Sequence, residues 1–339
     1  MKINNFDTNK KTLIIAEVGN NHEGSYSLAE DLVGLASDSG ADAIKFQTFK
    51  TKFFVDKSDM NRFNMLKSFE LTYNDFEKLK KVASSENLIF ISTPLDLMSA
   101  QFLSKIVDAI KISSGDNTFY PLIEEVARMG KPTILSTGLS DLKQITKAKK
   151  LIDETCIKNK IKSQLAILHC VSAYPVDFNQ ANLLAIKTLI NEFDCDIGYS
   201  DHTIGIHAAT SAVALGANII EKHFTIDKQF SDFRDHQLSA DPTDLKKLVK
   251  EVREIEAMLG SGIKKIQDIE KDALRLMRRS VVAKNRLAKG HIIQIDDISW
   301  TRPSGGINPG DESMIIGKKL KNNIDAGSKI LRENLQENS

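Results

Sequence analysis

Cysteine is scarce in this sequence, and long apolar runs are missing. The three cysteines, Cys156, Cys170 and Cys195, form no CxxC pair. An odd number suits reduced thiols in a reducing compartment, although a nucleophilic role stays open for Cys170. No stretch of about 18 apolar residues suggests a membrane-spanning helix, and residues 1–11 lack the apolar segment of a signal peptide. We therefore expect a cytoplasmic protein that does not bind membranes.

Net charge is also nearly absent. The 339 residues include 46 Lys and Arg and 45 Asp and Glu, which gives a formal net charge of +1. Such a chain has no bulk attraction to nucleic acid or to an anionic membrane, so an anionic ligand must be held by local charges. Apolar residues make up 41% of the sequence, which is ample for a core. The length suits one large domain and one small domain.

Short β-branched runs alternate with longer segments of helical period, a pattern typical of parallel strands joined by helices. Eight such runs begin at Thr12, Asp42, Leu88, Asp108, Pro132, Leu165, Asp196 and Asn218. Eight strand–helix units are the number that closes a parallel barrel, so we predict a (β/α)8 TIM barrel in the α/β class. A doubly wound open sheet is the alternative. The first loop, GNNHEGS (19–25), lacks the GxGxxG motif expected there.

The sequence changes character after the last barrel unit. We expect a catalytic barrel over residues 1–262 and a charged linker without Gly or Pro over 263–279. A small domain then covers 280–339. Within it, LAKG (287–290) and IDAG (324–327) begin two similar stretches, which predicts two related halves. A domain this small buries only a modest core, so we expect it to pack on the barrel or on another subunit.

Polar residues end nearly all of the predicted strands, at the face where β/α barrels carry their active sites. In chain order these residues are Glu17, Lys45, Gln47, Thr93, Lys111, Ser113, Ser114, Ser136, Thr137, His169, Asp201, His202, Glu221 and His223. Serine and threonine at such positions often only cap the next helix, and this alternative stays open for Thr137. Capping does not explain lysines, carboxylates and three histidines on one rim.

His202 and His223 end the neighbouring seventh and eighth strands, so their side chains can start roughly 5 Å apart. The alternative is a pair of buried, hydrogen-bonded histidines. Two imidazoles with a carboxylate and water, and with no cysteine nearby, suit Mn²⁺ or another divalent ion such as Mg²⁺ or Co²⁺ better than structural Zn²⁺. We therefore predict a divalent-metal site here.

Lys45 and Lys111 predict a cationic cradle for phosphate and carboxylate groups. The hydroxyls that complete it are those of Thr93, Ser114 and Ser136. Each lysine has two alternatives: a buried partner for a carboxylate, or a Schiff-base nucleophile. We expect Glu17, Asp116 and Glu221 to lie opposite the cradle, where they would bind sugar hydroxyls and move protons. Glu221 alternatively orients a metal ligand.

Eight strings in order resemble the sialic acid synthase family, and the resemblance covers nearly the whole chain. They are EVGNNHEGS (17–25), IKFQT (44–48), FISTP (90–94), KISSGD (111–116), ILSTG (134–138), LHCVSAYP (168–175), GYSDHT (198–203) and EKHF (221–224). The tail, which contains TRPSGG (301–306), is similar to the antifreeze-like (SAF) domain that ends these enzymes.

The resemblance implies a transferase that condenses phosphoenolpyruvate with an N-acyl mannosamine-type sugar and releases phosphate by C–O cleavage. It implies Mn²⁺ on His202 and His223, and a carboxylate, Glu17, near the reacting centre. The residues implied for phosphoenolpyruvate are Lys45, Thr93, Lys111, Ser114 and Ser136, and those implied for the sugar are Gln47, Tyr174 and Asp235. Arg302 would enter the barrel of another subunit, as in a domain-swapped homodimer. The alternative for Arg302 is a surface turn.

Two positions depart from the family pattern for N-acetylmannosamine. Asp116 stands where Glu is typical, and Ser172 stands where Asn is typical. Both face the sugar in that pattern, so a different sugar is expected, for example the diacetamido hexoses that lead to legionaminic or pseudaminic acid. No partner is assigned to the charged segment SDFRDHQLSADP (231–242). The rival functions are a Schiff-base aldolase and a non-catalytic protein that binds sugar acids.

Overall fold

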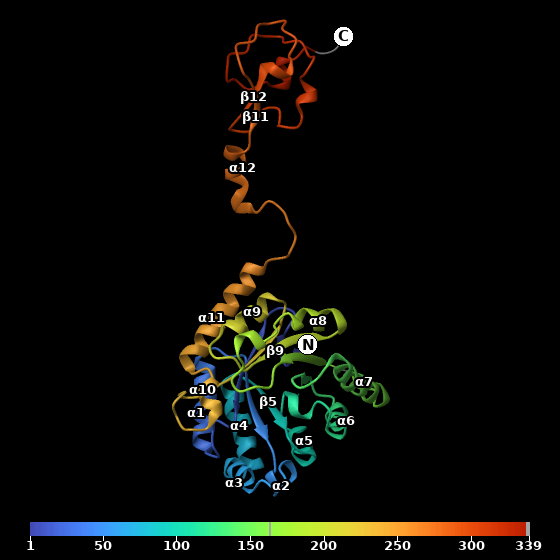
Figure 1. The fold of residues 1–339 in the computed structure, drawn as a ribbon, viewed down its shortest axis with the longest axis vertical. Coiled ribbons are helices and arrows are strands. Elements are labelled where there is room, and N and C mark those ends of the chain that lie inside the picture. The colour runs from blue at the N-terminus through green and yellow to red at the C-terminus, as the bar shows by residue number, and fades with distance from the viewer. Residues whose placement is uncertain (163, 337–339) are drawn as a thin grey trace. The chain divides into compact units, whose positions relative to one another are not determined.

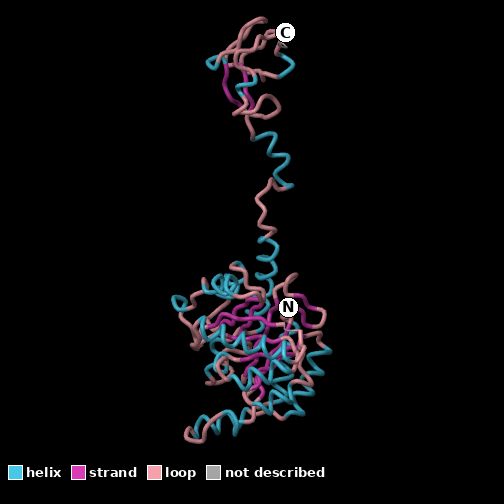
Figure 2. Tube along the Cα trace, turned by 90° about the vertical axis from the view of Figure 1, so that its right-hand side faces the viewer, coloured by secondary structure: helices cyan, strands magenta, loops and turns pink. Residues whose placement is uncertain are grey.

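The computed structural model describes residues 1–162 and 164–336, and its first unit is a closed parallel barrel. Figure 2 shows the strands surrounded by helices. The strands are β3 (Leu13–Gly19), β4 (Ala43–Thr48), β5 (Ile89–Pro94), β6 (Ala109–Ile112), β7 (Thr133–Ser136), β8 (Leu165–Cys170), β9 (Asp196–Asp201) and β10 (Ile219–His223). β10 pairs with β3 in parallel register and closes the barrel. The predicted barrel is confirmed, and the open sheet is wrong.

Helices on the outside connect successive strands (Figure 1). They are α1 (Tyr26–Asp38), α4 (Tyr73–Ser85), α5 (Leu97–Leu103), α6 (Tyr120–Arg128), α7 (Leu142–Lys158), α8 (Ala185–Glu192) and α9 (His207–Ala214), and α11 (Pro242–Leu259) follows the last strand. Side chains cap several N-termini: Thr72 and Asp141 form capping boxes for α4 and α7, and Asp241 caps α11. Among residues 1–162 and 164–336, no helix has the length and apolar character that a bilayer span requires.

Several short elements were not expected from the sequence. An antiparallel hairpin, β1 (Lys2–Ile3) and β2 (Phe6–Asp7), precedes the barrel. Two helices, α2 (Thr51–Phe54) and α3 (Met60–Phe69), are inserted between β4 and α4, and α10 (Arg234–Leu238) follows β10. The last three lie after the carboxyl ends of β4 and β10, so they contribute to the face of the barrel that carries the site.

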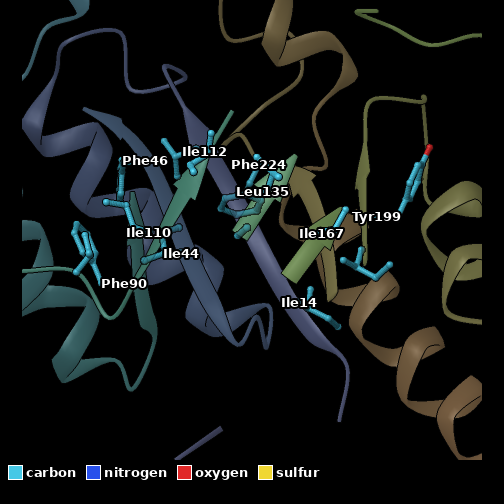
Figure 3. Packing of buried hydrophobic residues seen from close by; sticks show 14 of the residues in the cluster. Ile14, Ile44, Phe46, Phe90, Ile110, Ile112, Leu135, Ile167, Tyr199 and Phe224 are labelled. Atoms are coloured by element: carbon cyan, nitrogen blue, oxygen red, sulfur yellow. The ribbon is translucent and has the colours of Figure 1, made fainter. Parts of the chain in front are cut away.

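Alternation along each strand produces two cores. Outward side chains such as Ile14, Ile44 and Phe90 pack against the helices (Figure 3). Inward side chains form a smaller cluster that includes Leu13, Ile15, Ala43, Ile89, Ile91, Ala109, Ile134, Ala166, Leu168 and Ile219. The barrel interior is crowded at Gly198, where an added Cβ would lie 2.4 Å from the carbonyl oxygen of Ile219. Further along the strands, toward their carboxyl ends, the inward residues become polar.

The second unit comprises residues 261–339, of which the structure describes 261–336. It contains the short helices η3 (Asp268–Glu270) and α12 (Lys271–Met277), and β11 (Ser280–Ala283) pairs with β12 (Ile298–Thr301). Leu287 and Ile324 exchange two backbone hydrogen bonds of 2.8 Å. Gly290 and Gly327, three residues after each, have φ of 84° and 78°. The two repeated stretches of the sequence thus face each other across this bridge, over a core of their own.

Candidate active site

One cavity of about 1280 Å³ opens at the carboxyl end of the barrel. The barrel residues predicted for catalysis, substrate or metal line it: Glu17, Lys45, Gln47, Thr93, Lys111, Ser114, Asp116, Ser136, Ser172, Tyr174, His202, Glu221, His223 and Asp235. Thr137, His169 and Asp201 were also expected on the rim but do not line it. Arg302 belongs to the second unit, where it is exposed. The cavity is large enough for two small substrates, since binding sites of roughly 300–1,000 Å³ hold drug-sized ligands.

The floor of the cavity is a charged layer made by Glu17, Lys45, Lys111 and Glu221. Lys45 Nζ lies 2.8 Å from Glu17 Oε2 and 3.7 Å from Glu221 Oε2. Lys111 Nζ donates to both Glu221 oxygens, at 2.8 and 2.6 Å. None of these four residues is more than 5% exposed. The expectation that Glu17 and Glu221 lie opposite the lysines is wrong, because buried charges require partners of opposite sign.

The two carboxylates of this layer ionise differently. Burial raises the pKa of Glu17 above its usual value, and the nearby charge of Glu221 adds to the effect. Burial opposes ionisation of Glu221 as well, but the ammonium groups of Lys111 and Lys45 outweigh it and hold its pKa well below the usual range. Glu17 is therefore the group that can carry a proton, while Glu221 stays ionised. Carboxylates whose environments separate their pKa values are typical of acid–base catalysis.

Hydroxyl groups surround the charged layer. Thr93 Oγ1 accepts a hydrogen bond of 3.2 Å from Lys45 Nζ, and Ser114 Oγ accepts one of 3.1 Å from the Gly138 amide. Ser200, which sequence reasoning missed, donates to Glu221 at 2.9 Å. Thr137 does not cap a helix, so that alternative is wrong: its hydroxyl donates to the Leu168 carbonyl at 2.8 Å, and Asp141 caps α7.

The predicted histidine pair lies beside the charged layer. The rings of His202 and His223 have centroids 5.3 Å apart. His202 Nδ1 is 2.9 Å from the Val171 carbonyl oxygen. If Nδ1 carries the proton and donates to this oxygen, Nε2 is free to bind a ligand. His223 Nδ1 is buried and has no hydrogen-bond partner. Burial, followed by the charge of His202, lowers the pKa of His223 well below its usual value, which keeps this imidazole neutral.

These two imidazoles lie close enough together to share a metal ion. Neutral nitrogens are the form that binds metal ions, and the orphaned Nδ1 of His223 is an unused acceptor. In the described ranges, no group of three or more His, Cys, Asp or Glu is arranged to hold a metal ion. One expectation is wrong: a cysteine is nearby, since Cys170 Sγ lies 3.9 Å from His202 Nδ1.

His169, which was expected on the rim, does not reach this cavity. It points outward from β8, where its Nε2 lies 2.9 Å from the Ala181 carbonyl oxygen. It lines a neighbouring cavity of about 560 Å³ between the loops that follow β7 and β8. Cys170, the next residue, takes the inward position on β8 and lines both cavities.

The residues expected to bind the sugar lie on the outer part of the cavity. Gln47 Nε2 donates to Glu17 Oε1 at 3.3 Å, and Arg234 stands over the Tyr174 ring with its Cζ 5.0 Å from the centroid. Asp116 Oδ2 accepts a bond of 2.6 Å from the Ser113 hydroxyl, and burial raises the pKa of Asp116. The Ser172 hydroxyl is buried without a hydrogen-bond partner.

Segments without a strand signal complete the cavity wall, and sequence reasoning missed most of them. α3 contributes Arg62, Met65, Leu66 and Phe69. The ring of Phe233 meets that of Phe69 edge-on, with centroids 5.2 Å apart. The partner of the charged segment at 231–242 is now assigned: His236, fully buried, places Nε2 3.0 Å from Glu23 Oε1 in the loop after β3.

A buried histidine in the loop after β3 predicts a pH effect on stability. His22 Nδ1 accepts a bond of 3.0 Å from the Gly24 amide, and burial lowers its pKa to about 4. An unfolded histidine titrates near 6.5, so between pH 6.5 and 4 the unfolded state binds more protons and stability rises with pH. Between pH 7 and pH 5, we expect the free energy of unfolding of the wild type to fall by about 2 kcal/mol more than that of His22→Gln. Urea unfolding at both pH values measures this, and equal losses would contradict it.

Comparisons with known proteins show which family the chain resembles. Residues 32–264 match the model of the NeuB family, and residues 278–336 match that of the SAF domain. The N,N'-diacetyllegionaminic acid synthase of Legionella pneumophila is 40% identical over 337 residues, which cover 95% of this chain and 94% of that protein. A pseudaminic acid synthase of Campylobacter jejuni is 33% identical over 346 residues, covering 97% of this chain and 98% of that protein.

A solved structure shares the architecture. The N-acetylneuraminic acid synthetase of Leptospira borgpetersenii, crystallised with citrate, superposes with a TM-score of 0.76 at 36% sequence identity. The superposition covers 81% of this chain and 94% of that one. With a family match over most of the barrel and similar relatives over nearly the full length, the chain belongs to the NeuB family and ends in an SAF domain.

Proposed function

We propose that this protein condenses phosphoenolpyruvate with an open-chain N-acyl amino sugar to give a sialic-acid-type nine-carbon acid. The observation that carries the proposal is the charged layer, in which two buried lysines lie within reach of hydroxyl donors at the floor of a cavity of about 1280 Å³. Phosphoenolpyruvate has a phosphate and a carboxylate, so it matches two cations. The sugar would fill the outer part of the cavity.

In this reaction C3 of phosphoenolpyruvate forms a bond to the aldehyde carbon, and the aldehyde oxygen takes up a proton. Water adds to C2 and loses a proton, and the bond between C2 and the phosphate oxygen then breaks. Lys45 and Lys111 would bind the anionic groups and stabilise the charge that develops on the departing phosphate. Glu17, which burial keeps able to hold a proton, would donate to the aldehyde oxygen, while Glu221 holds the lysines in place.

A divalent metal ion at the histidine pair is part of the proposed function. His202 and His223 would hold Mn²⁺ or a similar divalent ion, which acts as a Lewis acid on the aldehyde when bound. Supporting features are the neutral His223 with its unpartnered Nδ1 and the neighbouring His202 ring.

For the sugar, we propose a 2,4-diacetamido hexose of the legionaminic acid type. Asp116 and Ser172 line the cavity at the two positions that depart from the N-acetylmannosamine pattern. The Ser172 hydroxyl has no partner within the protein, so it is available to a ligand. The legionaminic acid synthases of Legionella pneumophila and Campylobacter jejuni are 40% and 38% identical to this chain.

Incubation with phosphoenolpyruvate, Mn²⁺ and a panel of N-acyl hexosamines, followed by mass spectrometry, tests both the proposed reaction and the proposed sugar. We expect phosphate release and a product with the mass of a diacetamido nonulosonic acid, and loss of activity in EDTA. If N-acetylmannosamine were the only sugar that gave a product, the proposal of a diacetamido hexose as substrate would be wrong. No phosphate release with any sugar would contradict the reaction and favour a protein that only binds sugar acids.

A Schiff-base aldolase is the second candidate, and one observation favours it. Burial, together with the charge of Lys45, lowers the pKa of Lys111, as a nucleophilic lysine requires. However, Lys111 Nζ is bonded to both oxygens of Glu221, which favours its charged form. Borohydride trapping with pyruvate separates the two reactions: a covalent lysine adduct would favour the aldolase.

We also propose that Arg302 reaches the sugar in the barrel of another subunit, in a domain-swapped homodimer in the cytoplasm. The family resemblance of TRPSGG (301–306) supports this, and Arg302 is exposed within its own unit. We expect Arg302→Ala to raise KM for the sugar far more than KM for phosphoenolpyruvate in steady-state kinetics. Equal effects on both would argue against the swap, and Arg286→Ala, an exposed arginine of the same unit, is the control.

A further inference from the structure

A buried ion pair joins the two strands that carry the histidines. Lys222 of β10 and Asp201 of β9 are register partners, and Lys222 Nζ lies 2.9 Å from Asp201 Oδ2. Each residue immediately precedes one of the histidines in the sequence. Because side chains alternate along a strand, the pair points away from the cavity when His202 and His223 point into it. Both members are only 1% exposed, and neither lines the cavity.

This ion pair also fixes the peptide groups that follow His202. Asp201 Oδ1 accepts hydrogen bonds from the Thr203 amide at 2.8 Å and from the Tyr199 hydroxyl at 3.2 Å. Lys222 Nζ donates to the Thr203 carbonyl oxygen. Thr203 is therefore held at both its N–H and its C=O, and His202 is fixed between two anchored residues.

His223 is anchored separately by its own backbone. Its carbonyl oxygen accepts a bond of 2.7 Å from the Ala240 amide, and the next amide, that of Phe224, donates to the Glu17 carbonyl oxygen at 2.7 Å. Besides the backbone pairing of β9 and β10 and the hydrogen bond from Ser200 to Glu221, the Asp201–Lys222 pair thus links the strand that carries His202 to the strand that carries His223.

We propose that Asp201 and Lys222 are positioning residues that set the separation of His202 and His223 and thereby the affinity and geometry of the metal site. The inference rests on the proposed function, because it requires that the two imidazoles share a divalent ion. Stability alone does not account for the pair, since replacing a buried ion pair by apolar residues is often neutral or stabilising. What the pair supplies is a fixed geometry between two strands.

The test measures metal binding to the metal-free protein and does not depend on turnover. Free Mn²⁺ is followed by electron paramagnetic resonance, and Co²⁺ absorption reports the coordination geometry. The double variant Asp201→Asn with Lys222→Met removes both charges, so no unpaired charge is buried, and asparagine still accepts from the Thr203 amide. We expect Mn²⁺ binding to weaken about 10- to 100-fold, as for other groups that orient metal ligands, with a changed Co²⁺ spectrum and a Tm near that of the wild type.

Lys80→Met is the matched control, because it breaks an outer ion pair of 2.6 Å with Asp108 and should leave Mn²⁺ binding unchanged. If the double variant does not fold, Asp201→Glu keeps both charges but changes the reach of the pair, and weakened Mn²⁺ binding is expected there too. Wild-type binding and an unchanged Co²⁺ spectrum in whichever variant folds would overturn this inference alone. Equal Mn²⁺ binding by the wild type and His202→Gln would overturn the metal proposal and this inference with it.

Discussion

Replacing Lys111 with methionine is expected to lower kcat/KM for phosphoenolpyruvate by at least about 100- to 1,000-fold, the usual cost of removing one preorganised donor from a developing anion. Two effects act together. The variant loses a cation at the cavity floor, and it frees Glu221 from the partner that binds both of its oxygens. A buried carboxylate without that partner would then repel the incoming phosphate. Steady-state kinetics with phosphate release as the readout measures the effect.

Lys131→Met is the control for this experiment. Lys131 Nζ donates a hydrogen bond of 3.0 Å to the Val107 carbonyl oxygen. Lys131 lies just before β7, so it is at the end of the barrel opposite the cavity. We expect it to change stability slightly and kcat/KM hardly at all. If Lys111→Met retained more than about a tenth of wild-type kcat/KM, a loss of only about 1.4 kcal/mol, Lys111 would not be a main donor to the substrate anion.

Glu17→Gln is expected to lower kcat about 100- to 10,000-fold, the range for removal of a general acid or base, with little change in KM for either substrate. Glutamine retains the size of Glu17, and its one carbonyl oxygen can still accept from Lys45, although its amide nitrogen cannot accept from Gln47 Nε2. It cannot release a proton. The pH profile separates this role from a structural one. Because burial raises the pKa of Glu17 and the protonated form is the acid, wild-type kcat should fall as pH rises through that pKa.

The Glu17→Gln profile should lack this descending limb. Glu30→Gln on α1, where Glu30 accepts a bond of 3.1 Å from the Tyr26 hydroxyl, is the control that should keep the wild-type profile. A Glu17→Gln enzyme that shows the same descending limb as the wild type would assign the limb to another group. In that case Glu17 would serve to hold Lys45 in place.

The sequence predicts the barrel and most of the cavity because alternation within each strand sorts side chains by face. Leu13, Ile15 and Glu17 share one face of β3, and the same rule places Lys45, Lys111 and Glu221 inside. His169 was wrongly placed in the cavity because a polar residue at the end of a strand was assumed to point inward. In LAILHC, the alternation that puts Ala166 and Leu168 inside also puts Cys170 inside and His169 outside.

Alternation within a strand does not predict which side chains meet across the barrel. Lys111 on β6 and Glu221 on β10 lie on strands that are not neighbours, so no register relates them. Only the closed geometry brings them within 2.6 Å. The cavity wall formed by α3 was missed for another reason: Arg62 and Phe69 belong to a helix inserted between β4 and α4, and they do not directly end a strand. Sequence spacing alone does not reveal which loop folds over a barrel.

The charged layer has a consequence for selectivity between anions. Glu17 and Glu221 contact the ammonium groups of Lys45 and Lys111, to which the proposed ligand's anionic groups would bind. An arriving anion must compete with these resident carboxylates rather than meet bare positive charge. A small ion with one anionic centre gains little from that exchange. A molecule with two separate anionic groups can engage both lysines at once, so we expect the cavity floor to favour ligands that carry two anionic groups over ligands that carry one.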